Sequence, residues 1–267
     1  MNIVVCIKQT PASSSVQIDP HTGELMSTGL TYAISPFDEY ALEEAIRLKE
    51  RVPGSWTAAV TMGPARSEEI LREAIARGID SVYHLSDEAF NDSDSYATAY
   101  VLSMGIRKIQ QEKGKVDVVI CAKQTNDGDT GQVGPGLSAW LDWPNVAFVK
   151  KVEEINDQIV RVERMMEDGM DVLEMKLPAL ISVVKEINEP RLPSLKGKMA
   201  SKKAVVAKWS AADIGADAAH LGLTGSPTKV WKKDAPARRQ GGVRIEGATI
   251  EEKAQKFVEK LKELKLL

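Results

Sequence analysis

The residues best suited to chemistry form one polar stretch, Ala122–Pro135, which reads AKQTNDGDTGQVGP. An apolar run over residues 116–121 precedes it and is typical of a buried strand. Apolar residues at helical spacing, Leu137, Trp140 and Leu141, follow it. The stretch is therefore predicted to be the turn between a strand and a helix.

Within this turn, Gly128 and Gly131 allow the backbone to approach a ligand closely, and Asp129 or Thr130 is suited to cap the helix. Backbone N–H groups that stay free at a helix start attract phosphate. Loops between strands and helices are normally short, whereas this one is long and polar, which favours a nucleotide site. The alternative is a surface loop with ordinary caps.

The composition is that of a soluble globular protein, with 267 residues, 43% of them hydrophobic and 27% charged. The net charge of −3 gives no reason to expect nucleic acid or an acidic membrane as a partner. His21, His84 and His220 are scattered, without the spacing of a zinc site or of a serine–histidine pair. We therefore predict no metal site and no catalytic side chain, and we expect any chemistry to come from a bound cofactor.

The two cysteines, Cys6 and Cys121, lie inside apolar runs and are more typical of core residues than of a disulfide. They indicate a reducing compartment, and we expect a cytoplasmic protein. No apolar run reaches the roughly 18–20 residues that cross a bilayer. The N-terminal run over residues 2–8 is too short for a signal sequence and is predicted to be the first strand.

Strand and helix patterns alternate over the first 140 residues, which predicts an α/β fold of the doubly wound type, with a parallel sheet and helices on both faces. Residues 9–29 predict a hairpin-like excursion after the first strand. In such sheets, ligands bind at the carboxyl ends of the strands. The turns and helix start expected at that edge are Lys8–Thr10, Ser35–Asp38, Thr61–Pro64 and Ala122–Thr130.

After Pro144, short apolar runs separated by turn residues predict antiparallel strands added to the parallel core. These runs span residues 147–152, 158–163, 172–176 and 179–184. Residues 186–197 contain two prolines and a glycine and are predicted to form an irregular loop. The residues alone leave open whether Leu192 and Leu195 are buried under this loop or exposed to a partner protein.

A last short strand is predicted over residues 203–209. From Gly215 to Gly247 the composition shifts to Gly, Ala, Pro, Lys and Arg, and Glu251–Leu264 has the pattern of an amphipathic helix. We therefore predict an α/β nucleotide-binding domain over 1–210 and a C-terminal arm over 211–267. Such an arm usually packs on a partner subunit, and the alternative is a helix folded back on its own sheet.

Several segments together resemble the electron-transfer flavoprotein beta subunit over essentially the whole chain. The family's signature segment is similar to Val162–Gly169, continuing to Leu173 and Pro178–Ile181, with mild departures at Asp171 and Ser182. Further similar segments are Ser35–Glu39, Thr61–Pro64 and Asn188–Arg191.

The resemblance implies a heterodimer with an alpha subunit that carries a redox-active FAD, and either AMP or a second FAD in this chain. Leu195 falls at the family's recognition-loop leucine, which enters an apolar pocket of a partner acyl-CoA dehydrogenase. That loop would span about 186–200 and include Pro190 and Arg191. By position, the resemblance implies nucleotide contacts in two groups. The first group is Cys6, Ser35, Pro36, Phe37, Asp38 and Met62. The second group lies in Ala122–Thr130 and just after it: Ala122, Lys123, Gln124, Asn126, Asp127, Gly128, Asp129, Thr130, Gly131 and Gln132.

The nucleotide is predicted to be FAD. Asp127–Pro135, Val183–Glu189 and Ile18–Pro20 resemble the branch of the family that binds a second FAD and bifurcates electrons from NADH. Asp92–Ser95 departs from that branch, and Leu141–Pro144 resembles the branch that binds AMP.

The predicted function is electron bifurcation between NADH, an acyl-CoA dehydrogenase and a low-potential acceptor. The alternative is a structural AMP, with single electrons passing through the alpha-subunit FAD alone. A stand-alone ATP-binding α/β protein is a remote alternative, because the chain has no glycine-rich phosphate loop that ends in lysine.

Overall fold

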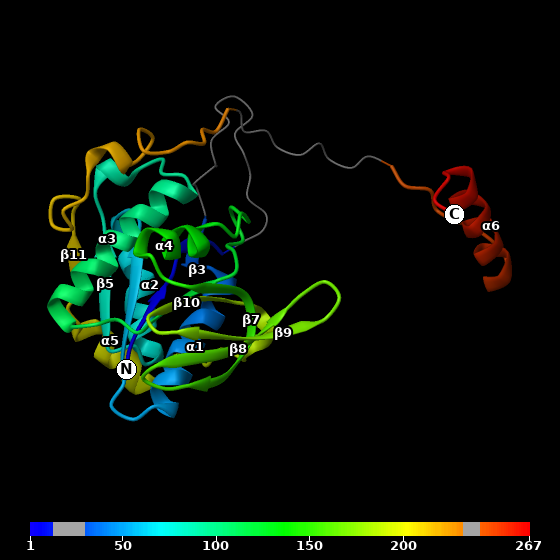
Figure 1. Ribbon diagram of the computed structural model, residues 1–267. Helices are drawn as coiled ribbons and strands as arrows, with labels where there is room; N and C mark the ends of the chain where they lie inside the picture. Colours follow the sequence, from blue (N-terminus) through cyan, green and yellow to red (C-terminus); the bar gives the residue numbers. More distant parts are fainter. Residues whose placement is uncertain (13–29, 232–240) are drawn as a thin grey trace. The chain divides into compact units, whose positions relative to one another are not determined.

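The structure, a computed structural model, describes residues 1–12, 30–231 and 241–267 (Figure 1). Residues 1–12 and 30–231 belong to one compact unit, and residues 241–267 belong to a second, smaller unit. The larger unit is an α/β body, and the smaller one contains a single described helix.

A nine-stranded sheet forms the centre of the larger unit. Every neighbouring pair from β11 to β7 is parallel, and β7, β8 and β9 are antiparallel. The order across the sheet is β11 (Ala207–Trp209), β5 (Ser81–Leu85), β4 (Trp56–Met62), β1 (Asn2–Cys6), β6 (Val118–Ala122), β10 (Ala179–Val183), β7 (Asn145–Ile155), β8 (Ile159–Met165) and β9 (Met170–Lys176). The short strands β2 (Gln9–Pro11) and β3 (Tyr32–Ile34) pair separately and are antiparallel.

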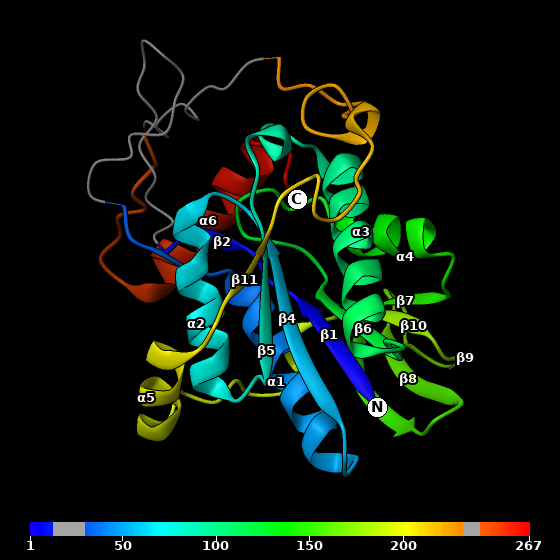
Figure 2. The ribbon, with the colours of Figure 1, turned by 90° about the vertical axis from the view of Figure 1, so that its left-hand side faces the viewer.

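Helices cover both faces of this sheet, as predicted. In β1, Ile3 and Val5 face a core shared with α1 and α2, whereas Val4 and Cys6 face a core shared with α3 and α4. Such a strand is apolar throughout because it is buried on both faces. Figure 2 shows the sheet between α2 and α3. The helices of this unit are α1 (Pro36–Arg51), α2 (Glu68–Arg77), α3 (Ser95–Lys113), α4 (Val133–Leu141) and α5 (Leu195–Lys203).

Local sequence signals fix where the helices begin and end. Pro36 occupies the first turn of α1, where no N–H donor is needed. The Asp94 carboxylate caps α3 by accepting hydrogen bonds from the N–H groups of Tyr96 and Ala97. Gly78 ends α2 with a φ of 129°, which favours glycine. These signals place the starts of α1 and α3 at the same edge of the sheet.

Three sequence predictions are wrong in detail. The run over residues 179–184 is not an added antiparallel strand: as β10 it lies between β6 and β7 and is parallel to both. The loop predicted over residues 186–197 ends early, because Leu195 already begins α5, which the Ser194 hydroxyl caps by accepting from Gly197 N–H. The last strand starts at Ala207 rather than at Lys203. Of the hairpin predicted over residues 9–29, the part from 13 to 29 lies outside the described residues.

Residues 210–228 pack on the α/β body, and Thr228 is the last of them, donating to the Asp94 carboxylate. Ile214 and Leu221 are buried in the core on the α3 face, and the N–H of Asp217 donates a hydrogen bond to the Tyr100 hydroxyl of α3 (2.8 Å). The domain boundary at residue 210 and the arm over 211–267 stay predictions.

The second unit contains α6 (Ile250–Glu263), which the Thr249 hydroxyl caps. Its apolar side chains Phe257 and Val258 are exposed, as are Leu264 and Leu266 just beyond its end. None of the helices within 1–12, 30–231 and 241–267 combines the length and the hydropathy that a membrane span requires.

Candidate functional site

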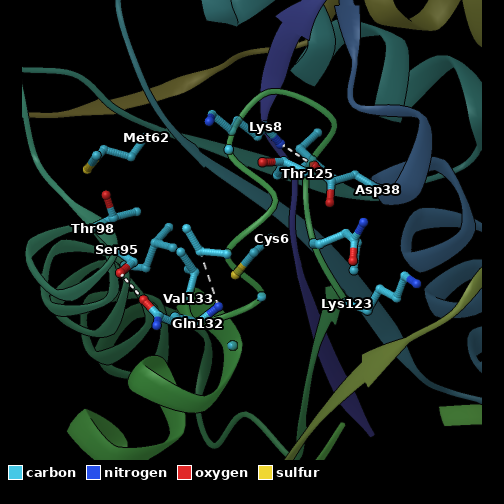
Figure 3. A pocket seen from close by; sticks show the side chains of 18 of the residues that line it. Cys6, Lys8, Asp38, Met62, Ser95, Thr98, Lys123, Thr125, Gln132 and Val133 are labelled. Carbon is cyan, nitrogen blue, oxygen red and sulfur yellow. Dashed lines mark hydrogen bonds between the residues drawn. The ribbon is translucent and has the colours of Figure 1, made fainter. Parts of the chain in front are cut away.

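A cavity of about 320 Å³ lies at the carboxyl edge of the parallel strands (Figure 3). β1, β4 and β6 end at it and contribute Cys6, Met62 and Ala122. The helices α1, α3 and α4 begin at it, and Asp38 and Ser95 come from the first turns of α1 and α3. Turns far apart in the sequence therefore meet at one rim, where a doubly wound sheet binds ligands.

Most of the predicted contacts are brought together here. The predicted residues that line the cavity are Cys6, Asp38, Met62, Ala122, Lys123, Gln124, Gly128, Thr130, Gly131 and Gln132. The other predicted contacts do not line the cavity: Ser35, Pro36 and Phe37 lie at the start of α1, and Asn126, Asp127 and Asp129 lie in the segment between β6 and α4.

The segment Ala122–Gln132, which we call the cavity loop, is held by its own side chains. The Thr125 hydroxyl donates to Asp127 (2.7 Å), and Thr125 C=O accepts from the N–H of Asp129 (3.1 Å). Gly131 has a φ of 65°, and a Cβ there would lie 3.1 Å from the carbonyl oxygen of Lys123. Glycine is therefore favoured at 131 by both conformation and space.

The predicted helix cap at Asp129 or Thr130 is wrong. α4 begins at Val133, its N-cap residue is Gln132, and no side chain caps it. The Thr130 hydroxyl accepts only from the N–H of Gln132, at 3.4 Å, one position before the helix. Because the first turn of α4 has no side-chain cap, the N–H groups of Val133 and Gly134 remain available to an anion, whereas Pro135 has none.

Gly134 brings this helix start close to the sheet. A Cβ at position 134 would lie 2.6 Å from the Ser182 hydroxyl oxygen of β10 and 3.7 Å from Cys121 Cβ. The third glycine of dinucleotide-binding turns has the same role of close helix–strand packing. From α3, the Ser95 hydroxyl donates to Oε1 of Gln132 at this helix start (3.0 Å), and Thr98 adds a second hydroxyl to the lining. Free N–H groups, two hydroxyls and the glycine-bearing loop together fit a nucleotide that carries phosphate.

The buried carboxyl of Asp38 is the most perturbed acid at the cavity. Burial raises the pKa of Asp38 to about 8, although the N–H of Lys8 donates to its Oδ2 (2.7 Å) and works in the opposite direction. The hydrogen bond to Cys121, together with burial, raises the pKa of the neighbouring Cys6 thiol, so Cys6 is a thiol and not a thiolate nucleophile. Within the described residues, no three His, Cys, Asp or Glu side chains come together as metal ligands.

The list of predicted contacts omits part of the lining: Ile7, Lys8, Ser93, Asp94, Ser95, Thr98, Leu102, Thr125, Val133 and Gly134. The sequence could have placed Lys8 in the lining, because Lys8 lies in a turn expected at this edge. It could also have placed Ser95 and Thr98 there, because a helix that follows a parallel strand begins at the carboxyl edge. Leu102 lies two turns into α3, and no local sequence pattern predicts that it lines the cavity.

A second region of interest is the exposed segment around Leu195. Leu195 and Leu192 are 79% and 86% exposed, so the alternative that buries both under the loop is wrong. Arg191 is engaged within the chain: its guanidinium contacts Glu43 (2.8 Å) and Glu50 (2.6 Å) of α1. Burial alone would raise the pKa of Glu43, but hydrogen bonds from Arg191 and Arg47 lower it. Arg191 thus fixes the loop from which Leu195 projects.

The start of α5 is also tightly placed. A Cβ at Gly197 would lie 2.0 Å from the carbonyl oxygen of Ala76, so glycine lets α5 pack directly on the end of α2. Arg72 of α2 donates to Ser201 C=O (2.8 Å). Both contacts hold Leu195 on a rigid support.

The fold and the cavity define an α/β protein with a polar, glycine-bearing site at the switch edge of a parallel sheet. A family model described as "Electron transfer flavoprotein domain" matches residues 22–214. The chain belongs to the electron-transfer flavoprotein family and is similar throughout to its beta subunits.

Three relatives illustrate this similarity. The chain is 45% identical over 262 residues to the electron transfer flavoprotein subunit beta of Thermoanaerobacterium thermosaccharolyticum, covering 98% of each chain. It is 41% identical over 263 residues to the caffeyl-CoA reductase-Etf complex subunit CarD of Acetobacterium woodii, again covering 98% of each. It is 38% identical over 263 residues to the protein FixA of Bradyrhizobium diazoefficiens, covering 97% of this chain and 90% of the relative.

Proposed function

We propose that the chain forms a heterodimer with an alpha subunit in the cytoplasm, that its cavity binds FAD, and that it passes electrons from NADH by bifurcation. The cavity between β1, β6, α3 and α4 carries this proposal, because its lining joins the free start of α4 to a glycine-bearing loop and two hydroxyls. The likeness to CarD, which is named as a subunit of a complex of a caffeyl-CoA reductase with Etf, supports a role beyond that of a structural nucleotide-binding subunit.

The chain's own residues have distinct tasks in this proposal. The N–H groups at the start of α4 and the hydroxyl of Thr98 bind phosphate oxygens, and the Ser95 hydroxyl, which donates to Gln132, orients that side chain at the helix start. Met62 and Leu102 provide apolar surface that excludes water from the site. Asp38 holds a proton on its buried carboxyl near neutral pH. A bound FAD would supply the exchange of an electron pair with NADH and of single electrons with other centres.

The exposed Leu195 supports an acyl-CoA dehydrogenase as the partner. An apolar side chain on a rigid helix start is suited to fill a pocket on another protein and to carry most of an interface's energy. The relative CarD is named as a subunit of a complex with a reductase of a CoA ester. We propose the same class of partner here, with Pro190 and Arg191 in the recognition loop and the α6 arm on the alpha subunit.

The cavity size favours a second candidate, AMP. A volume of about 320 Å³ is close to the lower limit of ligand pockets, roughly 300 Å³, and suits a mononucleotide better than a dinucleotide. AMP in the cavity would brace the fold, and single electrons would pass through the alpha-subunit FAD alone. The two candidates differ in whether this chain reacts with NADH.

An anaerobic titration of the purified heterodimer with NADH tests the proposed function. With FAD in the cavity, we expect NADH to bleach the flavin absorbance near 450 nm in the absence of any dehydrogenase. An absorbance that stays unchanged under NADH, yet falls when an acyl-CoA and its dehydrogenase are added, would contradict bifurcation and favour AMP.

A further inference from the structure

An ion pair joins the end of β1 to the cavity loop. The Lys8 ammonium lies 2.9 Å from Asp127 Oδ1 and 2.7 Å from Asp127 Oδ2, so both carboxylate oxygens accept from it. The two residues are 119 positions apart in the sequence. Lys8 lines the cavity, and Asp127 lies in the cavity loop, of which Thr125 and Gly128 also line it.

The two sides of this ion pair differ in how firmly they are held. On the β1 side, Lys8 N–H donates to Asp38 Oδ2 (2.7 Å), and Lys8 C=O accepts from Ser35 N–H (2.9 Å). Both contacts tie the Lys8 backbone to the start of α1. On the loop side, Asp127 receives a hydrogen bond from Thr125 of the same loop. The ion pair therefore ties the cavity loop, through Lys8, to the start of α1.

The strength of the ion pair suits a contact that opens and closes. The Lys8 and Asp127 side chains are 48% and 32% exposed, so water and salt screen their attraction. Burial tends to raise the pKa of Asp127, but the hydrogen bonds from Lys8 and Thr125 outweigh it and lower that pKa. Asp127 thus stays a carboxylate at neutral pH, and the pair persists while remaining weak.

We propose that Lys8 and Asp127 form a latch that holds the cavity loop closed over a bound nucleotide, and that its opening limits how fast the nucleotide leaves. This inference rests on the proposal that the cavity binds a nucleotide. The competing role for Lys8 is a direct contact with phosphate, in which case Asp127 would compete with the ligand for the same ammonium.

The two roles predict opposite effects of Asp127→Asn. In the experiment, the purified heterodimer is diluted rapidly and filtered at timed intervals. Chromatography of the filtrate then measures the FAD and the AMP that have been released. For the latch, we expect Lys8→Met and Asp127→Asn each to release nucleotide about two- to fivefold faster, the effect of losing a half-exposed ion pair. The charge swap Lys8→Asp with Asp127→Lys should return the rate toward that of the wild type. Slower release from Asp127→Asn, or unchanged rates in both single variants, would overturn the latch.

Salt and distant variants serve as controls. Release from the wild type should accelerate between about 0.05 and 1 M salt by a larger factor than release from the two single variants, because only the wild type has the Lys8–Asp127 ion pair to screen. Lys151→Met removes a comparable surface pair with Glu153, away from the cavity, and should leave release unchanged. A salt-independent wild-type rate would also overturn the latch. The chromatogram separately reports which nucleotide was bound, so an error in the proposed cofactor is distinguishable from an error in the latch.

Discussion

Replacing Leu195 by alanine is expected to lower the efficiency with which an acyl-CoA dehydrogenase exchanges electrons with the heterodimer by about 10- to 100-fold. Leu195 is 79% exposed at the first position of α5, where its side chain has no packing role in the body. Truncating an apolar anchor at the centre of an interface typically costs about 2 kcal/mol or more. The measurement is kcat/KM for the dehydrogenase in a coupled dye-reduction assay.

The same variant should keep its nucleotide and its stability. Alanine favours helix at position 195, and α5 remains fixed by Gly197 and Arg72 on α2. Leu223→Ala is the matched control, since Leu223 is also an exposed leucine but lies far along the chain from the recognition loop. An equal decrease in kcat/KM in both variants, or an unchanged kcat/KM in Leu195→Ala, would contradict the proposed role of the recognition loop.

Replacing Asp38 by asparagine is expected to remove a decline in stability with rising pH. Unfolded Asp38 loses its proton near pH 3.8, whereas in the fold it keeps the proton until about pH 8. Between these values the folded state binds more protons, so the free energy of unfolding falls by up to about 1.4 kcal/mol per pH unit as pH rises. The decline ends above about pH 8, where Asp38 is ionised in both states.

The measurement is the free energy of unfolding in urea, followed by tryptophan fluorescence of the purified chain from about pH 5 to 9. Asparagine keeps an oxygen that accepts from Lys8 N–H but has no proton to lose in this pH range. The variant should therefore gain stability relative to the wild type as pH rises. Asp87→Asn is the control: hydrogen bonds from the N–H groups of Ala89 and Ala211 lower the pKa of Asp87, so it is ionised in both states throughout this range. A constant difference between Asp38→Asn and the wild type across the range would show that Asp38 has no raised pKa.

The sheet and its helices were predictable because each strand leaves a local pattern. β6 and the part of β1 after Asn2 are apolar, as is typical of buried parallel strands, and Gly78 and Asp94 mark helix boundaries. The partner of β10 was not predictable in this way. Its five residues are all buried and read as a strand in any sheet, and only tertiary packing inserts it between β6 and β7.

The cavity was predictable at its edge but not in its detail. Turns after parallel strands meet at one rim, which brought Cys6, Met62 and the cavity loop together. The helix start was misplaced because Asp129 and Thr130 are good caps by type, yet Asp129 has a positive φ of 55° and α4 begins three residues after Thr130. The pair of Lys8 with Asp127 joins residues 119 positions apart, which no local pattern encodes.

The central claim is that the cavity at the carboxyl edge of β1, β4 and β6 holds FAD. The most direct test denatures the purified heterodimer and counts the released FAD and AMP by chromatography against the protein concentration. We predict two molecules of FAD and no AMP per heterodimer. One FAD with one AMP, or one FAD with no further adenine nucleotide, would contradict the claim.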